Sequence, residues 1–178
     1  MKFKDMVYIR PNIEKIKQEL SVLEQRIIGA QRVEDVLSAF YESEKIGGEY
    51  STMASLASVR HTIDTNDKFY DEENNFFDKN GPIVGDIFRS LNLALINSKF
   101  KVALEEKLGK LLFTNIEISV KSSSSKTIEL QAEENELMSK YQNLFASATV
   151  EWEESLYLFR CLAFTSSQAT AKSVKKHI

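Results

Sequence analysis

Residues that bind metals or form disulfides are scarce in this chain of 178 residues, which has one cysteine and two histidines. The lone Cys161 cannot close an intramolecular disulfide, which fits a reducing cytoplasm. A structural zinc site takes four Cys or His ligands. Because His61 and His177 lie far apart in the sequence, the residues define no local metal-binding motif.

Turn-forming residues are scarce too, with six glycines and two prolines. An all-β sandwich needs a turn about every 8–12 residues, so this composition favours helices. Eleven Phe, six Tyr and one Trp, within a hydrophobic share of 43%, supply enough apolar surface for a folded core. We predict a mainly α-helical fold of antiparallel helical hairpins or a bundle.

Charge and long apolar runs are also limited, which argues against two classes of partner. The formal net charge is −3, without the basic excess that a phosphate backbone attracts. No stretch approaches the ~18 apolar residues of a membrane span, and the first residues, MKFKD, contain no apolar signal region. We therefore expect a cytoplasmic protein with no nucleic-acid or membrane partner.

Apolar residues recur at spacings of three and four along most of the first 145 residues, as on the buried face of a helix. Pro11 suits a first helical turn, Asp67 is a potential N-cap, and Gly47-Gly48 and Gly81-Pro82 are typical of helix ends. These signals predict helices over residues 11–29, 31–47, 49–65, 67–80, 82–97, 98–121 and 127–145, which make a helical N-terminal domain of residues 1–145. In the last helix we expect Ile128, Leu137, Tyr141, Leu144 and Phe145 to face inward.

The period of the pattern changes after residue 145. Apolar and polar residues alternate from Ala148 to Glu153, and the β-prone run Leu156–Phe159 follows. We predict a β-hairpin over residues 146–165 and a basic tail over residues 166–178, either a short helix or frayed. A two-stranded hairpin is marginal alone, so its apolar side chains either fold back on the helices or bind a partner.

His61 and Asp64 are the first candidates for chemistry, since a carboxylate three residues away could orient the imidazole for acid–base work. The local sequence supplies no nucleophile. The pattern therefore favours a structural histidine, hydrogen-bonded to Asp64 or to a neighbouring helix, over a self-contained acid–base enzyme. We expect Cys161, which lies among apolar residues, to be a small core side chain rather than a reactive thiol.

Acidic and aromatic residues cluster in the next part of the chain. The acidic cluster lacks the Asp-x-Asp-x-Asp-Gly pattern of a calcium loop, so we predict a solvated helix face. Its members are Asp71, Glu72, Glu73 and Asp78. The aromatic residues at helical spacing predict core packing, because no Lys or Arg alternates with them as base stacking would need. Gly47-Gly48 lacks the phosphate-binding Gly-x-x-x-x-Gly-Lys pattern.

Several runs of the chain carry a family resemblance. Tyr50–Asp71 reads YSTMASLASVRHTIDTNDKFYD, and the part from Arg60 to Tyr70 is its most specific segment. Further matching runs, in order, are Met1–Met6 with Arg10-Pro11, Phe76–Asp78, LINSKF at 95–100, LEEKLGKLLF at 104–113 and EENEL at 133–137. Over about residues 1–160 the chain resembles the N-terminal region of oligoendopeptidase F-type zinc metallopeptidases, relatives of thimet oligopeptidase.

The resemblance implies a helical wall around a deep channel that admits short unfolded peptides. In that family zinc is bound by a His-Glu-x-x-His helix and a later Glu, and the motif Glu activates water. This chain contains no His-Glu pair, so no catalytic, cofactor-binding or metal residue can be carried over. It also departs from the family at Ser122–Ser125, at Glu154 and over Ser166–Lys172, and the agreement fades after Phe159.

We therefore predict the N-terminal part of an oligoendopeptidase-like zinc metallopeptidase that hydrolyses short peptides. The chain would form channel wall, exclude large substrates and be inactive alone. Its partner would be an oligopeptide, and zinc would be bound only by the full-length enzyme. The alternative is a free-standing helical module that binds a partner or a second copy of itself through its C-terminal hairpin.

Overall fold

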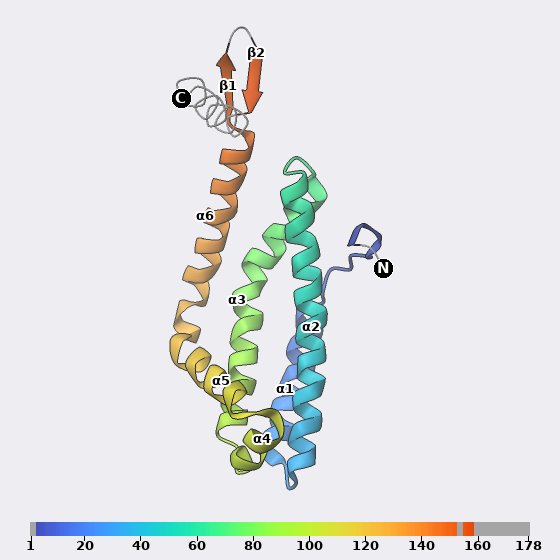
Figure 1. Ribbon diagram of the computed structural model, residues 1–178, viewed down its shortest axis with the longest axis vertical. Helices are drawn as coiled ribbons and strands as arrows, with labels where there is room; N and C mark the ends of the chain where they lie inside the picture. Colours follow the sequence, from blue (N-terminus) through green and yellow to red (C-terminus); the bar gives the residue numbers. More distant parts are fainter. Residues whose placement is uncertain (1–2, 153–154, 159–178) are drawn as a thin grey trace, which may run out of the picture. The chain divides into compact units, whose positions relative to one another are not determined.

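The computed structural model describes residues 3–152 and 155–158, and most of them are helical (Figure 1). The predicted mainly α fold is confirmed. The elements, in chain order, are a short 3-10 turn η1 (Phe3–Asp5), α1 (Ile13–Gly29), α2 (Val33–Ile63), α3 (Lys68–Ile96), α4 (Lys101–Leu108), α5 (Lys110–Ser122), η2 (Ser125–Thr127), α6 (Ile128–Ser147), β1 (Thr149–Trp152) and β2 (Ser155–Leu158).

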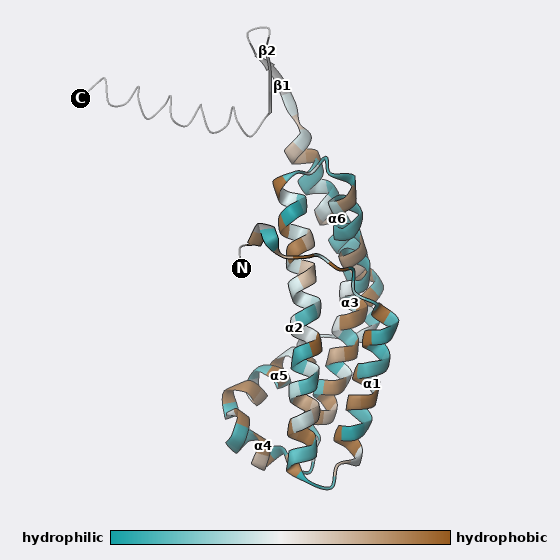
Figure 2. Ribbon diagram, turned by 90° about the vertical axis from the view of Figure 1, so that its right-hand side faces the viewer, coloured by the Kyte–Doolittle hydropathy of each residue, from teal (hydrophilic) through white to brown (hydrophobic). Residues whose placement is uncertain are grey.

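The chain divides into two compact units, Met1–Glu134 and Asn135–Ile178. In the first unit α1, α2 and α3 pack against one another, and the views from two sides show them side by side (Figures 1 and 2). The chain between η1 and α1 crosses α2 and α3 before α1 begins (Figure 2). The predicted division into residues 1–145, 146–165 and 166–178 stays a prediction.

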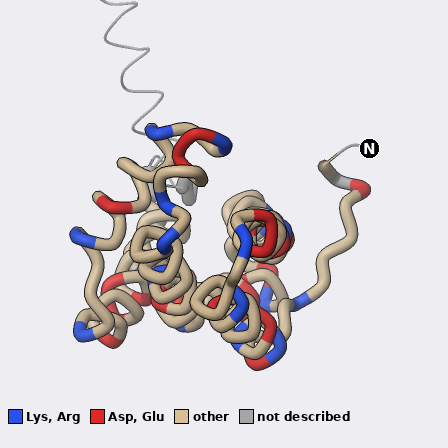
Figure 3. The backbone as a smooth tube through the Cα atoms, turned by 90° about the horizontal axis from the view of Figure 1, so that it is seen from below, with Lys and Arg blue, Asp and Glu red and all other residues tan. Residues whose placement is uncertain are grey.

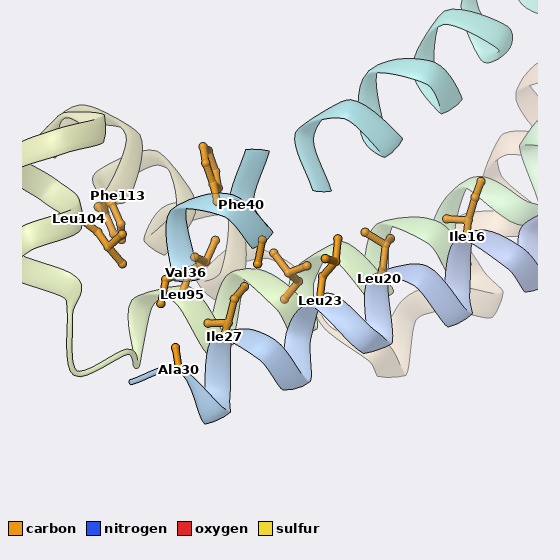
Figure 4. Packing of buried hydrophobic residues seen from close by; sticks show 12 residues of the cluster. Ile16, Leu20, Leu23, Ile27, Ala30, Val36, Phe40, Leu95, Leu104 and Phe113 are labelled. Carbon is orange, nitrogen blue, oxygen red and sulfur yellow. The ribbon is translucent and has the colours of Figure 1, made fainter. Parts of the chain in front are cut away.

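The core of the first unit follows the apolar spacing of its helices. Ile16, Leu20, Leu23 and Ile27 form the buried stripe of α1, as the period of three and four predicts. They meet Val36 and Phe40 of α2 and Leu91 and Leu95 of α3, and Leu104 and Phe113 extend the cluster into α4 and α5 (Figure 4). Each fully buried leucine contributes about 1.5–3 kcal/mol, so this cluster dominates the stability of the unit.

The predicted helix end at Gly47-Gly48 is wrong, because α2 runs without interruption from Val33 to Ile63. A Cβ added at Gly47 would lie 3.1 Å from Cζ of Phe88 on α3. The glycine therefore allows close packing of two helices, and that packing outweighs its low helix propensity of about 1 kcal/mol relative to alanine.

The predicted end at Asn80-Gly81-Pro82 is also wrong, because α3 continues from Lys68 to Ile96. Pro82 lacks the N–H that would bond to the carbonyl four residues earlier. Pro82 is itself buried, and Val84, Leu91 and Leu95 continue the buried face beyond it. Tertiary packing thus outweighs one missing hydrogen bond. The side-chain amide of Asn80 donates 2.8 Å to the carbonyl of Phe76 in the same turn.

The helix predicted over residues 98–121 is divided at Gly109, whose φ of +93° separates α4 from α5. Such a backbone conformation favours glycine, which has no Cβ to clash. The apolar spacing continues on both sides of Gly109, so the sequence pattern did not predict the end of α4 at this residue. The polar stretch Ser122–Ser125 does contain the predicted loop, between α5 and α6.

The helix predicted over residues 127–145 is α6, and the inward orientation of its apolar residues stays a prediction. Leu137, Tyr141 and Leu144 are exposed, Leu144 at 70%. Helical spacing identifies a common face and does not say whether another element covers it.

Beyond α6, β1 and β2 pair antiparallel, with Thr149 opposite Leu158. The predicted hairpin over 146–165 stays a prediction, since residues 153–154 and 159–165 lie outside the described residues.

The helices of the described residues were also compared with what a membrane span requires. None of them combines the length and the apolar character that a span needs.

Candidate functional site

The segment between η1 and α1, residues 6–12, is held across α2 and α3 by polar contacts, and we call it the N-terminal strap. Tyr8 and Arg10 both reach the carboxylate of Glu73 on α3. The Tyr8 hydroxyl donates to Oε2, and the guanidinium of Arg10 donates through Nε, at 2.9 Å to Oε2, and through Nη2 to Oε1. Glu73 is only 3% exposed, so its charge is buried and paired.

A second anchor of the strap lies on α2. Arg60 donates from Nη2 to the carbonyl of Met6 at 2.6 Å and from Nη1 to the hydroxyl of Tyr70 at 2.6 Å. Its guanidinium also lies 5.8 Å from the ring centre of Phe3 and 5.5 Å from that of Tyr70, within reach of a cation–π contact. The strap is thus fixed at residues 6, 8 and 10.

The electrostatics of the strap follow from this pairing. Hydrogen bonds from Arg10 hold the pKa of Glu73 below its usual range, and the Tyr8 hydroxyl acts in the same direction. Burial, together with the hydrogen bond to Glu73, raises the pKa of Tyr8. The hydroxyl therefore stays protonated and remains a donor to the carboxylate.

A groove of about 770 Å³ runs from the strap along α1 and α2. Pro11, Ile16, Ile46 and Tyr50 provide its more buried apolar lining. Charged side chains of both signs stand on its rim, Lys15 and Glu19 from α1 and Lys45 and Glu49 from α2. Such a groove can bind an elongated ligand that has an apolar part and polar ends.

His61 and Asp64, the candidate acid–base pair, take structural places. His61 is buried on α2, and its Nδ1 lies 3.9 Å from Oδ1 of Asp71. Asp64 is the C-cap of α2, and its carboxylate accepts a hydrogen bond from the backbone N–H of Asn66. The carboxylate nearest to His61 among the ion pairs of the described residues is thus that of Asp71, from the next helix.

The solvated acidic face predicted for Asp71, Glu72, Glu73 and Asp78 is wrong at Glu73. That residue is buried because the strap covers it and provides the donors that its charge needs.

Residues 3–152 and 155–158 contain no group of three or more His, Cys, Asp or Glu side chains that could hold a metal ion. The described residues therefore do not fit a zinc site. Cys161 and the lysines of the tail lie outside the described residues.

One feature of the sequence could have indicated the strap, although the helical spacing of apolar residues did not include it. Polar Tyr8 and Arg10 alternate with apolar Val7 and Ile9, as in an extended segment with two different sides. The partner, Glu73, lies more than sixty residues away, and nothing local distinguishes it from Glu72.

The aromatic residues at helical spacing were predicted to pack in the core. That prediction is wrong at Phe69, which is exposed.

Comparisons with protein families and with solved structures place this helical unit among the N-terminal domains of a peptidase family. Residues 3–123 match the family described as Peptidase M3 N-terminal domain. The chain belongs to that family, as the resemblance predicted. A comparison with curated protein sequences gave no match.

Solved structures agree with this assignment. The chain is 39% identical to PZ peptidase A, solved with an inhibitor, at a TM-score of 0.85 over 88% of this chain. It is 35% identical to a protein described as an oligoendopeptidase F from Bacillus anthracis str. Ames, at a TM-score of 0.84 over 89% of this chain. It is 31% identical to a further protein described as an oligoendopeptidase F, at a TM-score of 0.85 over 99% of this chain. The chain spans 28%, 29% and 33% of the lengths of these three proteins.

Proposed function

We propose that this chain is the helical wall of an oligoendopeptidase-like enzyme, where it borders the path of short peptides and excludes larger substrates. The observation that carries the proposal is the match of nearly the whole chain to about a third of PZ peptidase A and of two proteins described as oligoendopeptidases. Peptide hydrolysis, with zinc as the metal, would be carried out by residues other than those described here.

The internal construction of the first unit supports a wall rather than a catalytic centre. Its buried charge is neutralised by neighbours, as Glu73 is by Arg10, and is not available to a substrate. Its helices are long and share one apolar core (Figure 4). Figure 3 shows acidic and basic positions interspersed along these helices, which suits a surface that meets peptides of varied charge.

The first experiment measures hydrolysis by the purified chain of 178 residues. We expect no cleavage of an internally quenched oligopeptide, with or without added Zn²⁺. Zinc-dependent cleavage that copurifies with the chain and disappears with a chelator would overturn the proposal that this chain forms only the wall and does not hydrolyse peptides by itself.

The second experiment tests the wall itself in a chimera. Residues 1–158 replace the matching segment of the Bacillus anthracis protein, which is 35% identical to this chain. If the segment is a wall, the chimera cleaves a quenched oligopeptide and leaves folded proteins intact. A folded chimera that degrades a folded protein, while the parent does not, would contradict the exclusion role.

Two further expectations remain predictions. Cytoplasmic location rests on composition alone. Self-association through Trp152–Phe164, the alternative function, involves residues that lie mostly outside the described part, and light scattering of the chain would test it.

A further inference from the structure

We propose that the N-terminal strap is a hinged gate, which opens away from α2 and α3 while the helices stay folded and which the carboxylate of Glu73 holds closed. In its closed position the strap shuts one end of the groove along α1 and α2. The motion belongs to the first unit itself, so it does not depend on the wall function.

Few apolar contacts hold the strap on the helices. Val7 is 74% exposed and Ile9 is 69% exposed, and Tyr8 is only partly buried. None of residues 6–12, all of which the structure describes, belongs to the apolar cluster shared by α1–α5. Hydrophobic stabilisation is proportional to the apolar area removed from water. Separating the strap from the helices therefore costs little hydrophobic free energy compared with separating the helices from one another.

The backbone of the strap also has few hydrogen bonds to break. Among the described residues, the N–H groups of Val7, Tyr8 and Arg10 donate none. The N–H of Ile9 lies 3.3 Å from the sulfur of Met53, which is a weak acceptor. Segments with few buried apolar contacts open locally, at a free energy below that of global unfolding. The strap has the properties of such a segment, whereas the helices have a shared core.

Polar contacts on two helices keep the strap closed. Arg10 and Tyr8 both donate to the carboxylate of Glu73 on α3. On α2, Nη2 of Arg60 donates to the carbonyl of Met6 at 2.6 Å. Hydrogen bonds to an ionised group are stronger than those between neutral groups. Because Glu73 is charged and accepts from two strap side chains, it contributes most to closure.

Opening also changes the surroundings of Glu73 in a way that limits the cost. The carboxylate is 3% exposed because the strap covers it. When the strap leaves, the carboxylate loses its donors and its cover together, so water solvates it and no unpaired charge stays buried. The guanidinium of Arg10, whose side chain is 51% exposed in the closed position, is solvated as well. The open strap is therefore compatible with a folded unit.

The pivot of the strap lies between Arg10 and the first turn of α1. Asn12 is the N-cap of α1, and its side chain accepts a hydrogen bond of 2.9 Å from the N–H of Lys15. This cap belongs to the helix, so it stays in place when the strap opens. Pro11 alone separates the last anchor from the cap. Since the proline ring fixes φ, rotation about the ψ angles of Arg10 and Pro11 moves the strap.

An open strap changes one end of the groove. Ile9, Arg10, Pro11 and Asn12 line the groove together with α1 and α2. Met53 is the most C-terminal residue of α2 in this lining, and the N–H of Ile9 lies beside its sulfur. The closed strap therefore limits how far an elongated ligand can extend beyond Met53. Opening removes Ile9 and Arg10 from the lining and lifts that limit.

Chymotrypsin, whose apolar pocket accepts a Tyr side chain, reports the opening directly. The Tyr8 ring lies 6.0 Å from the ring of Phe69 and 6.1 Å from that of Tyr70. The Tyr8 hydroxyl donates to Glu73. The protease therefore reaches the bond between Tyr8 and Ile9 only when the strap has left the helices. Mass spectrometry measures how fast the full chain yields a fragment that begins at residue 9.

Glu73→Gln and Glu72→Gln are the matched variants for this measurement. Glu72 precedes Glu73 on α3, is exposed and forms no hydrogen bond to the strap among the described residues. When opening and closing are fast relative to cleavage, the cleavage rate follows the open population. We expect Glu73→Gln to accelerate cleavage about tenfold, because a charged acceptor is lost. Glu72→Gln should leave the rate unchanged, and circular dichroism should show both variants to be helical.

A urea series distinguishes local opening from global unfolding, because sensitivity to urea scales with the surface exposed. Phe113, which is 1% exposed, becomes accessible only on unfolding. Between 0 and about 1 M urea, cleavage after Tyr8 should change less than about twofold, whereas cleavage after Phe113 should rise about tenfold. Three results would overturn the gate: equal urea dependence at the two sites, equal rates for the two glutamine variants, or cleavage after Tyr8 as fast as in a free peptide of residues 3–12.

Discussion

Glu73 is the residue whose environment depends most on a distant partner. Removing Arg10 leaves a carboxylate buried with one hydroxyl donor, whereas neutralising Glu73 leaves a guanidinium that can turn to solvent, because the Arg10 side chain is half exposed. We expect Arg10→Leu to lower the free energy of unfolding by about 3 kcal/mol and Glu73→Gln by about 1–2 kcal/mol.

Urea unfolding of the two single variants and of the double variant measures this asymmetry. In the double variant neither charge remains, so its loss should be smaller than the sum of the single losses. Additive losses would mean that the two side chains do not stabilise each other.

Tyr50 has a polar atom without a partner. Its hydroxyl is buried and forms no hydrogen bond among the described residues, and burial raises the pKa of Tyr50 to about 12. Since a buried unpaired hydroxyl costs free energy, Tyr50→Phe should leave the free energy of unfolding unchanged or raise it by up to about 1 kcal/mol. Tyr8→Phe, which removes a donor to Glu73, should lower it by about 1–2 kcal/mol. Thermal unfolding of both variants tests the contrast, and equal losses would contradict it.

The sequence predicted part of this residue-scale chemistry. It indicated a structural role for His61, which is buried. It could not predict the burial of Glu73, because that depends on a chain segment more than sixty residues earlier that folds over α3. Local pattern assigns a charged residue to solvent by default, and only tertiary structure reveals the exceptions.

Among the elements, α2 contains two adjacent glycines that have different surroundings. A methyl group at Gly47 would press on the Phe88 ring at 3.1 Å, whereas one at Gly48 would meet nothing. Gly48→Ala should raise the free energy of unfolding by about 1 kcal/mol through helix propensity. In Gly47→Ala the same gain is offset by overpacking, which costs about 1–3 kcal/mol. Chemical denaturation of both variants tests this, and equal stabilisation would show that Phe88 moves freely.

Apolar spacing gave the type and approximate position of most helices, including α1 and the far end of α3. It failed where Gly and Pro were taken as helix ends at Gly47-Gly48 and at Pro82, because buried residues on both sides of each site hold one continuous helix. It failed again at Gly109, where the apolar pattern continues through a real break. At Gly47-Gly48 and at Pro82 tertiary packing, which the local sequence does not contain, decides the outcome, whereas at Gly109 the positive φ of the glycine ends the helix.

The exposed stripe of α6 gives a prediction at the same scale. Leu144 is 70% exposed, so Leu144→Glu should change the free energy of unfolding by less than about 0.5 kcal/mol. Leu20 on α1 is fully buried, and Leu20→Glu should prevent stable folding. Circular dichroism with urea tests both variants. A loss of more than 2 kcal/mol at Leu144 would mean that residues outside the described part cover the stripe.

At the scale of the whole molecule, acid should destabilise the fold through its paired carboxylates. Hydrogen bonds from Arg10, Arg26 and Lys101 hold the pKa values of Glu73, Glu42 and Glu117, respectively, below the usual range. The unfolded chain therefore binds protons more readily than the folded one, so stability rises with pH through this range. The contribution is fully present above the unfolded pKa of about 4.3 and is lost as the pH falls through the lower folded values.

Glu73 should account for most of this dependence, because it is buried, whereas Glu42 and Glu117 are accessible and solvent screens their pairs. Urea midpoints measured at pH 6, 4 and 3 should fall steeply for the native chain and less steeply for Glu73→Gln. The variant is less stable at pH 6, but it has one fewer carboxylate to protonate, so the two curves should approach each other in acid. Parallel curves would show that the strap contact contributes nothing to the acid sensitivity of the fold.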